Sequence, residues 1–94
     1  MQFVVPIRKN KIGRLEAVNH FETCRIQTVS RKDNPLFHRL LEEFGLQSGD
    51  PVLLNTSFNG KDEPIVCTPF HALQTFLHLS LDVLFMGSYI IVKK

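Results

Sequence analysis

The chain has 94 residues, of which 44% are hydrophobic and eight are phenylalanine. A chain of this length and apolar content is one domain or part of one, and it is not a disordered polypeptide. The net charge is only +2, yet seven of the eleven lysines and arginines fall in the first third: Arg8, Lys9, Lys11, Arg14, Arg25, Arg31 and Lys32. This asymmetry favours an anionic ligand, although solvated surface cations give the same pattern. Nucleic acid is disfavoured as a partner because its binding faces are normally denser in charge and interleaved with aromatic residues.

Cysteine and histidine spacing argues against disulfide and metal chemistry. Cys24 and Cys67 are far apart and form no C-x-x-C pair, which is typical of buried free thiols in a reducing cytoplasm. The four histidines lack the short paired spacings of a zinc site, so no metal site is predicted. No apolar run approaches the roughly 20 residues that span a bilayer. We therefore expect a cytoplasmic protein without a membrane partner.

Two strands are expected in the first third. Residues 2–7 have the β-branched and aromatic composition of a short strand, and Pro6 makes it an edge strand or a strand end. Residues 23–29 alternate in the manner of a half-exposed strand. The alternation places Arg25 and Gln27 on the same face.

A helix and a buried strand should follow. Asp33 or Asn34 is a candidate N-cap, Pro35 suits the first helical position, and the helix is expected to end at Gly45. Apolar residues at spacings of three and four predict a stripe that packs on a sheet: Leu36, Phe37, Leu40, Leu41 and Phe44. Residues 51–55 form an apolar run typical of a strand buried on both faces, which would complete a strand–helix–strand crossover.

The last third repeats this pattern. Thr68 and Pro69 open a second helix, whose predicted stripe comprises Phe70, Leu73, Phe76 and Leu77. Residues 83–92 contain two short strands separated by Gly87 and Ser88, as either a tight hairpin or a bend. The fold class is α/β, with α+β as the alternative. We expect a mixed, twisted sheet of four to five strands with two packed helices.

A polar segment follows the apolar run at residues 51–54. Asn55, Ser57 and Asn59 share one face of an extended chain, and each needs a hydrogen-bond partner, at a cost of about 1–3 kcal/mol for a buried group left without one. Ligands in open α/β sheets bind beyond the carboxyl ends of strands, which favours a ligand here. The alternative is an Asn59-Gly60 hairpin turn whose neighbours bond only to the loop backbone. Ser57 is a poor candidate for a hydrolase nucleophile because it lacks the G-x-S-x-G elbow.

Arg25 is the strongest candidate for binding an anion. A guanidinium that projects from a strand suits bidentate binding of phosphate or carboxylate. A structural salt bridge from Arg25 to Glu22 or Asp33 fits the sequence equally well.

Three ordered motifs resemble the carboxyl-terminal region of the ATP-dependent O-carbamoyltransferases of nodulation and antibiotic tailoring. They are "AVNHFETCRIQTVS", "PVLLNTSFN" and "EPIVCTP", which are similar to the family's H-x-D-G-T-x-R-x-Q-T-V, P-V-L-L-N-T-S-F-N and G-E-P-I-V-x-[ST]-P. The resemblance covers nearly the whole chain. Two departures, Glu22-Thr23 without the glycine and "NGKDEP" with its glycine moved forward, flank the expected pocket.

The resemblance implies a fold and a chemistry. The family's carboxyl-terminal domain is similar to the YrdC-type threonylcarbamoyl-adenylate synthases, and it uses ATP, as a substrate with Mg²⁺, and carbamoyl phosphate to make carbamoyl adenylate. A separate amino-terminal domain then passes the carbamoyl group to an acceptor hydroxyl. By position, Arg25 matches the arginine that holds phosphate oxygens, and Ser57 and Asn59 match the pair that contacts the nucleotide and carbamoyl phosphate. Asn55 and Thr56 would support that wall.

The resemblance also implies incompleteness. Residues 1–94 would be a single domain that begins part-way into the family's carboxyl-terminal domain, without the upstream half of the pocket or the catalytic amino-terminal domain. We therefore expect a fragment or split subunit of a carbamoyltransferase, inactive alone and completed by an amino-terminal domain in cis or in trans. The alternative is a non-catalytic interaction module or remnant that retains the fold. A small anion- or RNA-binding protein is a third reading that depends only on the basic first third.

Overall fold

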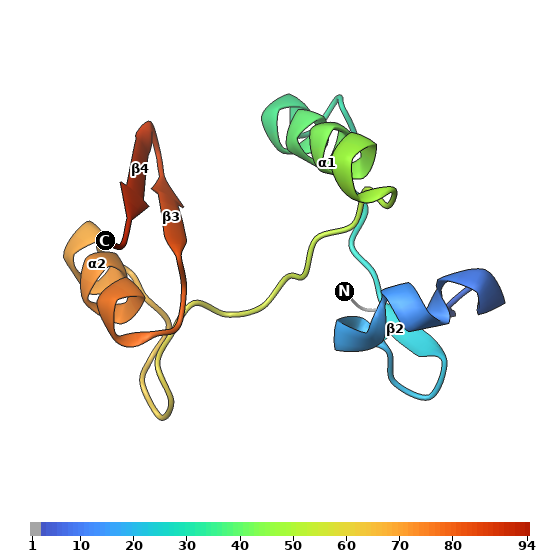
Figure 1. Cartoon of the computed structure of the whole chain (residues 1–94), viewed down its shortest axis with the longest axis horizontal. Coiled ribbons are helices and arrows are strands. Elements are labelled where there is room, and N and C mark those ends of the chain that lie inside the picture. Colours follow the sequence, from blue (N-terminus) through green and yellow to red (C-terminus); the bar gives the residue numbers. More distant parts are fainter. Residues whose placement is uncertain (1–2) are drawn as a thin grey trace. The chain divides into compact units, whose positions relative to one another are not determined.

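The computed structural model describes residues 3–94 and contains both helices and strands, as the sequence predicts (Figure 1). The elements in chain order are β1 (Val4–Pro6), the 3-10 helices η1 (Lys9–Arg14) and η2 (Glu16–Val18), β2 (Thr23–Arg25), α1 (Pro35–Ser48), α2 (Pro69–His78), β3 (Val83–Met86) and β4 (Tyr89–Val92). Contacts between Cα atoms divide the chain into two units, with unit 1 ending at Asn55 and unit 2 running from Thr56 to Lys94.

The expected sheet of four to five strands is wrong for the described residues. They form two separate two-stranded antiparallel sheets, in which β1 pairs with β2 and β3 pairs with β4. The first has Val4 opposite Arg25, and the second has Val83 opposite Val92. Pro6 pairs at the end of β1, as expected of a residue without an N–H donor. The predicted strand at residues 23–29 pairs only over Thr23–Arg25, because β1 is short.

Helix α1 begins where the sequence predicts. The Asn34 side-chain oxygen accepts a hydrogen bond from the Phe37 N–H at 3.2 Å, and Pro35 occupies the first turn. An N-cap of this kind satisfies one of the otherwise unpaired first-turn N–H groups, and proline is preset for the helical φ. Of the two candidate caps, Asn34 is therefore the one used.

The end of α1 differs from the prediction. The helix continues past Gly45 to Ser48, and Gly49 ends it with a left-handed φ of 87°. The role of Gly45 is close packing, because a Cβ at that position would lie 2.9 Å from Cβ of Pro51. The sequence contains two glycines that suit a helix end, and only the close approach of Pro51 distinguishes them.

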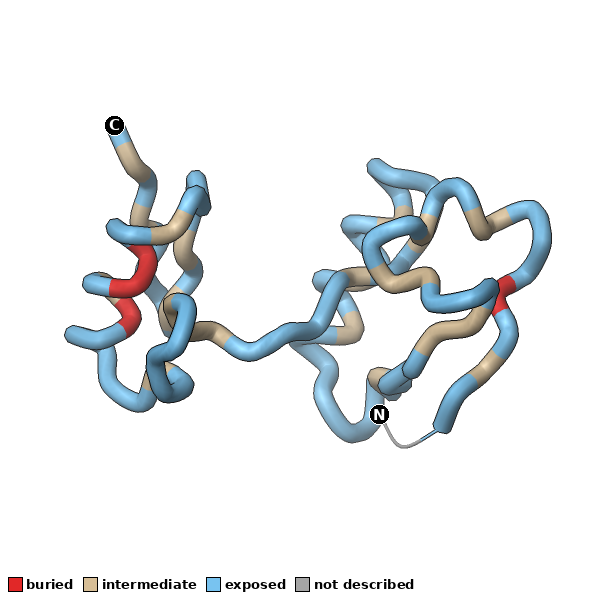
Figure 2. The backbone as a smooth tube through the Cα atoms, turned by 90° about the horizontal axis from the view of Figure 1, so that it is seen from below, coloured by how far each residue is buried: buried red, intermediate tan, exposed pale blue. Residues whose placement is uncertain are grey.

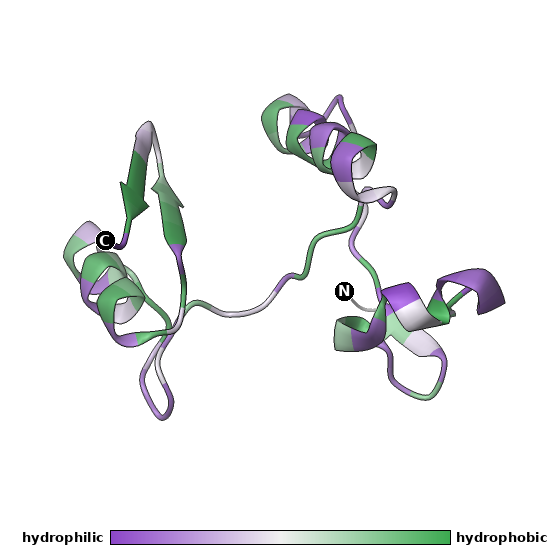
Figure 3. Cartoon of the chain, in the orientation of Figure 1, coloured by the Kyte–Doolittle hydropathy of each residue, from purple (hydrophilic) through white to green (hydrophobic). Residues whose placement is uncertain are grey.

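The apolar stripe of α1 does not pack on a sheet. No residue of Pro35–Ser48, all of which the structure describes, is buried, and Leu36 is 81% exposed and Leu40 52% exposed. Figure 3 shows this apolar face as green bands along α1. The predicted packing partner, the strand at residues 51–55, is not formed.

Residues 51–55 are extended but belong to no sheet, so the predicted strand buried on both faces is wrong. Val52 is 44% exposed and Leu54 is 60% exposed. The Val52 N–H donates to the Asp50 carbonyl at 2.8 Å, while Leu53 and Leu54 make no backbone hydrogen bond within the described part of the chain. The crossover unit therefore lacks its second strand.

Unit 2 has the better-formed core. The Thr68 hydroxyl accepts a hydrogen bond from the His71 N–H at 3.1 Å at the start of α2, which confirms the predicted cap. Strands β3 and β4 form the hairpin alternative, with Gly87 at a φ of 59° in a two-residue turn. The predicted stripe of α2 is confirmed at Phe76, which is buried, and Leu73 is half-buried, whereas Phe70 and Leu77 are about two-thirds exposed. The other buried residues of the helix are Ala72 and Thr75.

Few residues are fully buried. Within the described chain they are Ile7, Ala72, Thr75 and Phe76, and Phe76 alone is almost completely enclosed, at 1% exposure (Figure 2). The Lys93 ammonium lies 5.0 Å from the centroid of the Phe76 ring, at cation–π distance. The core of unit 2 thus centres on one aromatic side chain.

Candidate functional site

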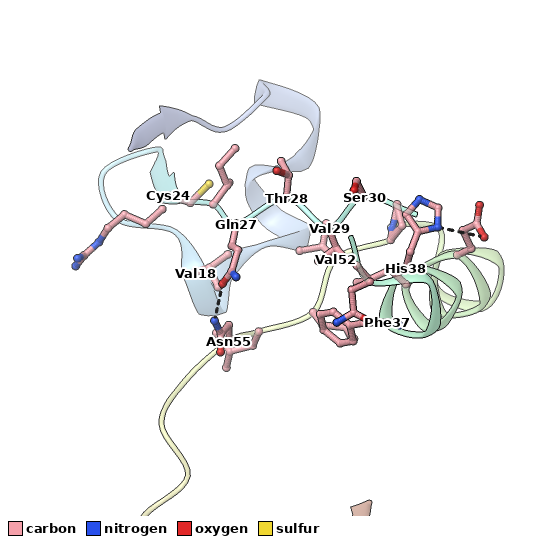
Figure 4. A pocket seen from close by; sticks show the side chains of 18 of the residues that line it. Val18, Cys24, Gln27, Thr28, Val29, Ser30, Phe37, His38, Val52 and Asn55 are labelled. Atoms are coloured by element: carbon pink, nitrogen blue, oxygen red, sulfur yellow. Dashed lines mark hydrogen bonds and ion pairs between the residues drawn. The ribbon is translucent and has the colours of Figure 1, made fainter. Parts of the chain in front are cut away.

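A cavity of about 960 Å³ lies within unit 1, between α1 and the two extended segments at residues 24–30 and 51–55 (Figure 4). Its lining includes the apolar side chains Leu15, Val18, Val29, Phe37, Leu41 and Leu53 and the polar side chains Arg25, Gln27, Ser30, His38 and Asn55. Two of the predicted site residues, Arg25 and Asn55, therefore border one cavity.

Arg25 and Gln27 both line this cavity, but so do Ile26 and Thr28 between and after them, so the lining does not test the predicted alternation. The Asn55 amide donates a hydrogen bond to Oε1 of Gln27 at 3.2 Å. This contact joins the two extended segments, as the labelled side chains in Figure 4 show. Gln27 was not among the predicted site residues, although the alternation pattern contains the signal for it.

The guanidinium of Arg25 is exposed at the end of β2. The ion pairs of the described residues connect Lys11 and Arg14 with Asp50, and Arg31 and His38 with Glu42. None of these pairs includes Arg25, so the alternative of a salt bridge to Glu22 or Asp33 is wrong. The fork of Arg25 retains its donors for an anion.

Thr56, Ser57 and Asn59 lie in unit 2. The Asn59 amide donates to the carbonyl of Gly60 at 2.9 Å, whereas the exposed Ser57 hydroxyl makes no hydrogen bond to any described residue. The unit boundary falls between Asn55 and Thr56, inside the polar segment. A shared wall made by Arg25, Ser57 and Asn59 therefore stays a prediction.

The turn after the polar segment is displaced from the Asn59-Gly60 pair. The Glu63 N–H donates to the Gly60 carbonyl at 3.2 Å, and Asp62 has a left-handed φ of 61°. A Cβ on Gly60 would lie 2.5 Å from Oε2 of Glu63, so glycine permits the side chain of Glu63 to fold over the turn. The two-residue hairpin alternative is wrong, and Asn59 precedes the turn.

Asp50 forms an ionic cluster that the sequence reading missed. Its carboxylate accepts from the Lys11 ammonium and lies 2.6 Å from Nε of Arg14, while the Arg14 guanidinium also donates to the Ser48 carbonyl. The Lys11 hydrogen bond is the main cause that holds the pKa of Asp50 below its ordinary value, with the charges of Arg14 and Lys11 adding to it against partial burial. Two cations of the basic first third are therefore structural.

His38 and Glu42 lie one turn apart on α1 beside the cavity. Nδ1 of His38 is buried and lies 3.5 Å from Oε2 of Glu42, an ion pair only when the imidazole is protonated, and it makes no hydrogen bond to any described residue. Glu42 also pairs with Arg31 at 3.1 Å. Glu42 is thus more than a solvating charge on the helix face.

Both cysteines are free thiols, but neither is buried, which corrects that part of the prediction. Cys24 lines the cavity, and Sγ of Cys67 lies 3.8 Å from Nδ1 of His71. Among residues 3–94, no cluster of three histidine, cysteine or acidic side chains could hold a metal ion. No helix in the described range is long and apolar enough to cross a bilayer.

Comparison with known proteins gives the family. The profile of the family described as "Carbamoyltransferase C-terminus" matches residues 1–93. The chain belongs to this carbamoyltransferase carboxyl-terminal family.

Named relatives share the match. Over 95 residues the chain is 47% identical to nodulation protein NolNO of Sinorhizobium fredii and 43% identical to nodulation protein NolO of Bradyrhizobium diazoefficiens. It is 45% identical over 60 residues, 63% of its length, to 3'-hydroxymethylcephem-O-carbamoyltransferase of Amycolatopsis lactamdurans. The whole chain matches NolNO and NolO but covers only 14% and 17% of them, and the third match covers 12% of that relative. The chain thus spans less than a fifth of the length of these curated relatives.

Proposed function

We propose that this chain contributes to the site at which a carbamoyltransferase binds ATP and carbamoyl phosphate to form carbamoyl adenylate. The observation that carries the proposal is Arg25: in a chain of this family, an arginine without an ion-pair partner in the described residues borders a cavity. Arg25 would hold phosphate oxygens, and Ser57 and Asn59 would contact the nucleotide and carbamoyl phosphate. Asn55 and Thr56 support these contacts.

The residue types suit phosphate chemistry. Arginine stays charged at all accessible pH values and offers two parallel N–H donors to a pair of phosphate oxygens. Neutral hydroxyl and amide groups orient the same oxygens, and transfer of phosphoryl-type groups depends mainly on such positioning and charge neutralisation. ATP would bring Mg²⁺ as its own counter-ion, so the metal needs no dedicated cluster in this chain.

Binding can be tested by NMR titration of the chain with ATP and with carbamoyl phosphate, each to millimolar concentration. We expect shifts at Arg25 and in residues 55–59, and Arg25→Ala should weaken phosphate binding by about 10- to 150-fold, because a charged hydrogen bond contributes about 1.5–3 kcal/mol. Arg39→Ala is the matched control, since Arg39 is exposed on α1 and does not line the cavity. Equal loss in both variants would contradict a specific role for Arg25.

Catalysis requires the larger amino-terminal part, either in the same polypeptide or as a partner. Mixing the chain with that part should give pyrophosphate release from ATP that depends on carbamoyl phosphate, and Arg25→Ala should abolish it. Tight association without pyrophosphate release would instead favour the non-catalytic interaction module. The extensive exposed apolar surface is the observation that keeps this second candidate in consideration.

A further inference from the structure

The cavity of unit 1 has unpaired backbone on two sides. Residues 27–29 form one wall, where Figure 4 labels Gln27, Thr28 and Val29. Residues 53–54 form another wall. Within the described chain, neither stretch makes a backbone hydrogen bond. Extended backbone of this kind is an open template for another strand.

The same cavity is mainly apolar away from Arg25, Gln27 and Asn55. Val29, Leu41 and Leu53 are only half-buried there, and Phe37 remains 39% exposed. An occupant that satisfies this lining must bring apolar side chains as well as backbone donors and acceptors. A β-strand has both and can fill the apolar part of the cavity, which leaves Arg25, exposed at the end of β2, for the phosphate groups of the proposed substrates.

We propose that a β-strand rich in apolar residues, from the region that precedes this domain in its longer relatives, inserts into the unit 1 cavity and pairs with residues 27–29 and 53–54. This inference rests on the proposed function, because it identifies where the amino-terminal partner attaches. The source of the strand follows from length: the match is to the carboxyl terminus of the family, and it covers only 14% and 17% of two relatives. The inserted strand would lie between the two extended segments, which α1 connects along the chain, and would form one sheet with them. It would also cover Val29 and Leu53.

Amide hydrogen exchange tests the proposal directly. The chain is measured alone and after co-expression with the amino-terminal part of the Sinorhizobium fredii nodulation protein, cut before the matched residues. We expect exchange of alternate amides within residues 27–29, and of one of Leu53 and Leu54, to slow by at least about 10-fold in the complex without any nucleotide. Successive N–H groups of a strand point to opposite edges, so only those that face the inserted strand gain ladder hydrogen bonds. The nodulation protein's own carboxyl-terminal segment is the positive control for a competent amino-terminal part.

Substitutions separate the cavity from the rest of the apolar surface. Val29→Asp places a charge in the cavity and should weaken association by about 10-fold or more. Leu36→Asp is the matched control: Leu36 is 81% exposed on α1, does not line the cavity, and should change association less than about twofold. Because Val29→Asp can also unfold unit 1, its helical circular dichroism is compared with that of the wild type, and the exchange measurement on the wild type remains decisive by itself.

Four outcomes would overturn the inserted strand. If the partner associates but leaves residues 27–29 and 53–54 unprotected, it binds elsewhere. If the chain does not associate although the positive control binds, no strand from this partner enters the cavity. Protection in the chain alone that grows with concentration assigns the cavity to a second copy, and protection by ATP and carbamoyl phosphate alone assigns it to a small molecule. If association protects these amides but gives no pyrophosphate release, the inserted strand is supported and the proposed function is contradicted. If the complex releases pyrophosphate but these amides stay unprotected, the proposed function is supported and the inserted strand is contradicted.

Discussion

The carboxylate of Asp50 connects η1 with the end of α1 in unit 1. It pairs with Lys11 and Arg14 of η1, and it follows α1 directly, where Arg14 also bonds to the carbonyl of Ser48. The side chain of Asp50 is only 15% exposed, so these contacts are less screened than an ordinary surface pair. The stability of unit 1 should therefore depend on the charge of this residue.

Asp50→Asn tests this dependence on charge. The folded state holds the pKa of Asp50 below its ordinary value of about 3.9, so the carboxylate contributes stability above that pH and loses it as the pH falls through the lowered folded pKa. Asp50→Asn should lower the urea midpoint of unit 1 at pH 7, and the difference from the wild type should be smaller at pH 2. Far-UV circular dichroism measures the midpoints.

The control for this experiment is Asp62→Asn. Asp62 is exposed in the turn of unit 2, and asparagine tolerates its left-handed φ. The control should leave the midpoint unchanged at both pH values. A midpoint for Asp50→Asn equal to that of the wild type at pH 7 would show that the cluster adds no stability.

At the scale of single residues, the sequence predicts contacts along the chain better than contacts between segments. The hydrogen bond from the Phe37 N–H to the Asn34 side chain is a predicted local contact that the structure confirms. The pairing of Asp50 with Lys11 has no local signature, because the two residues lie in different elements and many acidic residues could serve. For Arg25, an anion-binding role and a structural salt bridge fitted the sequence equally well, and only the three-dimensional arrangement distinguishes them.

Among the elements, the helices were predictable because their ends have local signals. Asn34-Pro35 and Thr68-Pro69 specify the starts of α1 and α2 through short-range hydrogen bonds and a fixed φ. Strands depend on partners distant in sequence, and the apolar run at residues 51–55 stays unpaired because no described strand reaches it. The strand-like composition of that run and its observed lack of a sheet are both consistent with a strand supplied from elsewhere.

Gly49→Ala tests the observed end of α1. Alanine at a φ of 87° costs about 1 kcal/mol, and its Cβ would come 2.9 Å from a terminal nitrogen of Arg14. We expect unit 1 to lose about 1 kcal/mol or more in urea unfolding. Gly13→Ala is the control, because open space surrounds the position of its Cβ. Equal midpoints for the two variants would contradict a capping role for Gly49.

Across the whole chain, apolar surface is under-buried for the number of residues. The accessible surface is 8437 Å², whereas two separate compact proteins of the lengths of the two units would together expose about 6,700 Å². The excess does not depend on how the units are placed, since the accessible surface of the chain is larger than that of two compact proteins that do not touch at all. It belongs to exposed side chains such as Leu36, Leu46 and Phe85. Exposed apolar surface of this extent is typical of protein–protein interaction sites.

The same contrast in burial predicts where the chain alone is stable. Helix α2 has three buried residues, Ala72, Thr75 and Phe76, whereas no residue of α1 is buried within the described chain. Because opening of a helix costs the burial of its side chains, amides of α2 should exchange at least about 10-fold more slowly than those of α1.

Phe76→Ala, which costs about 3–5 kcal/mol in a packed core, should bring α2 to the level of α1. Leu77→Ala, at a position 67% exposed on the same helix, should leave the protection of α2 within about threefold of the wild type. Equal protection of α1 and α2 in the wild type, measured by NMR-detected exchange, would show that α1 has a packing partner within these 94 residues and would remove the need for one from outside.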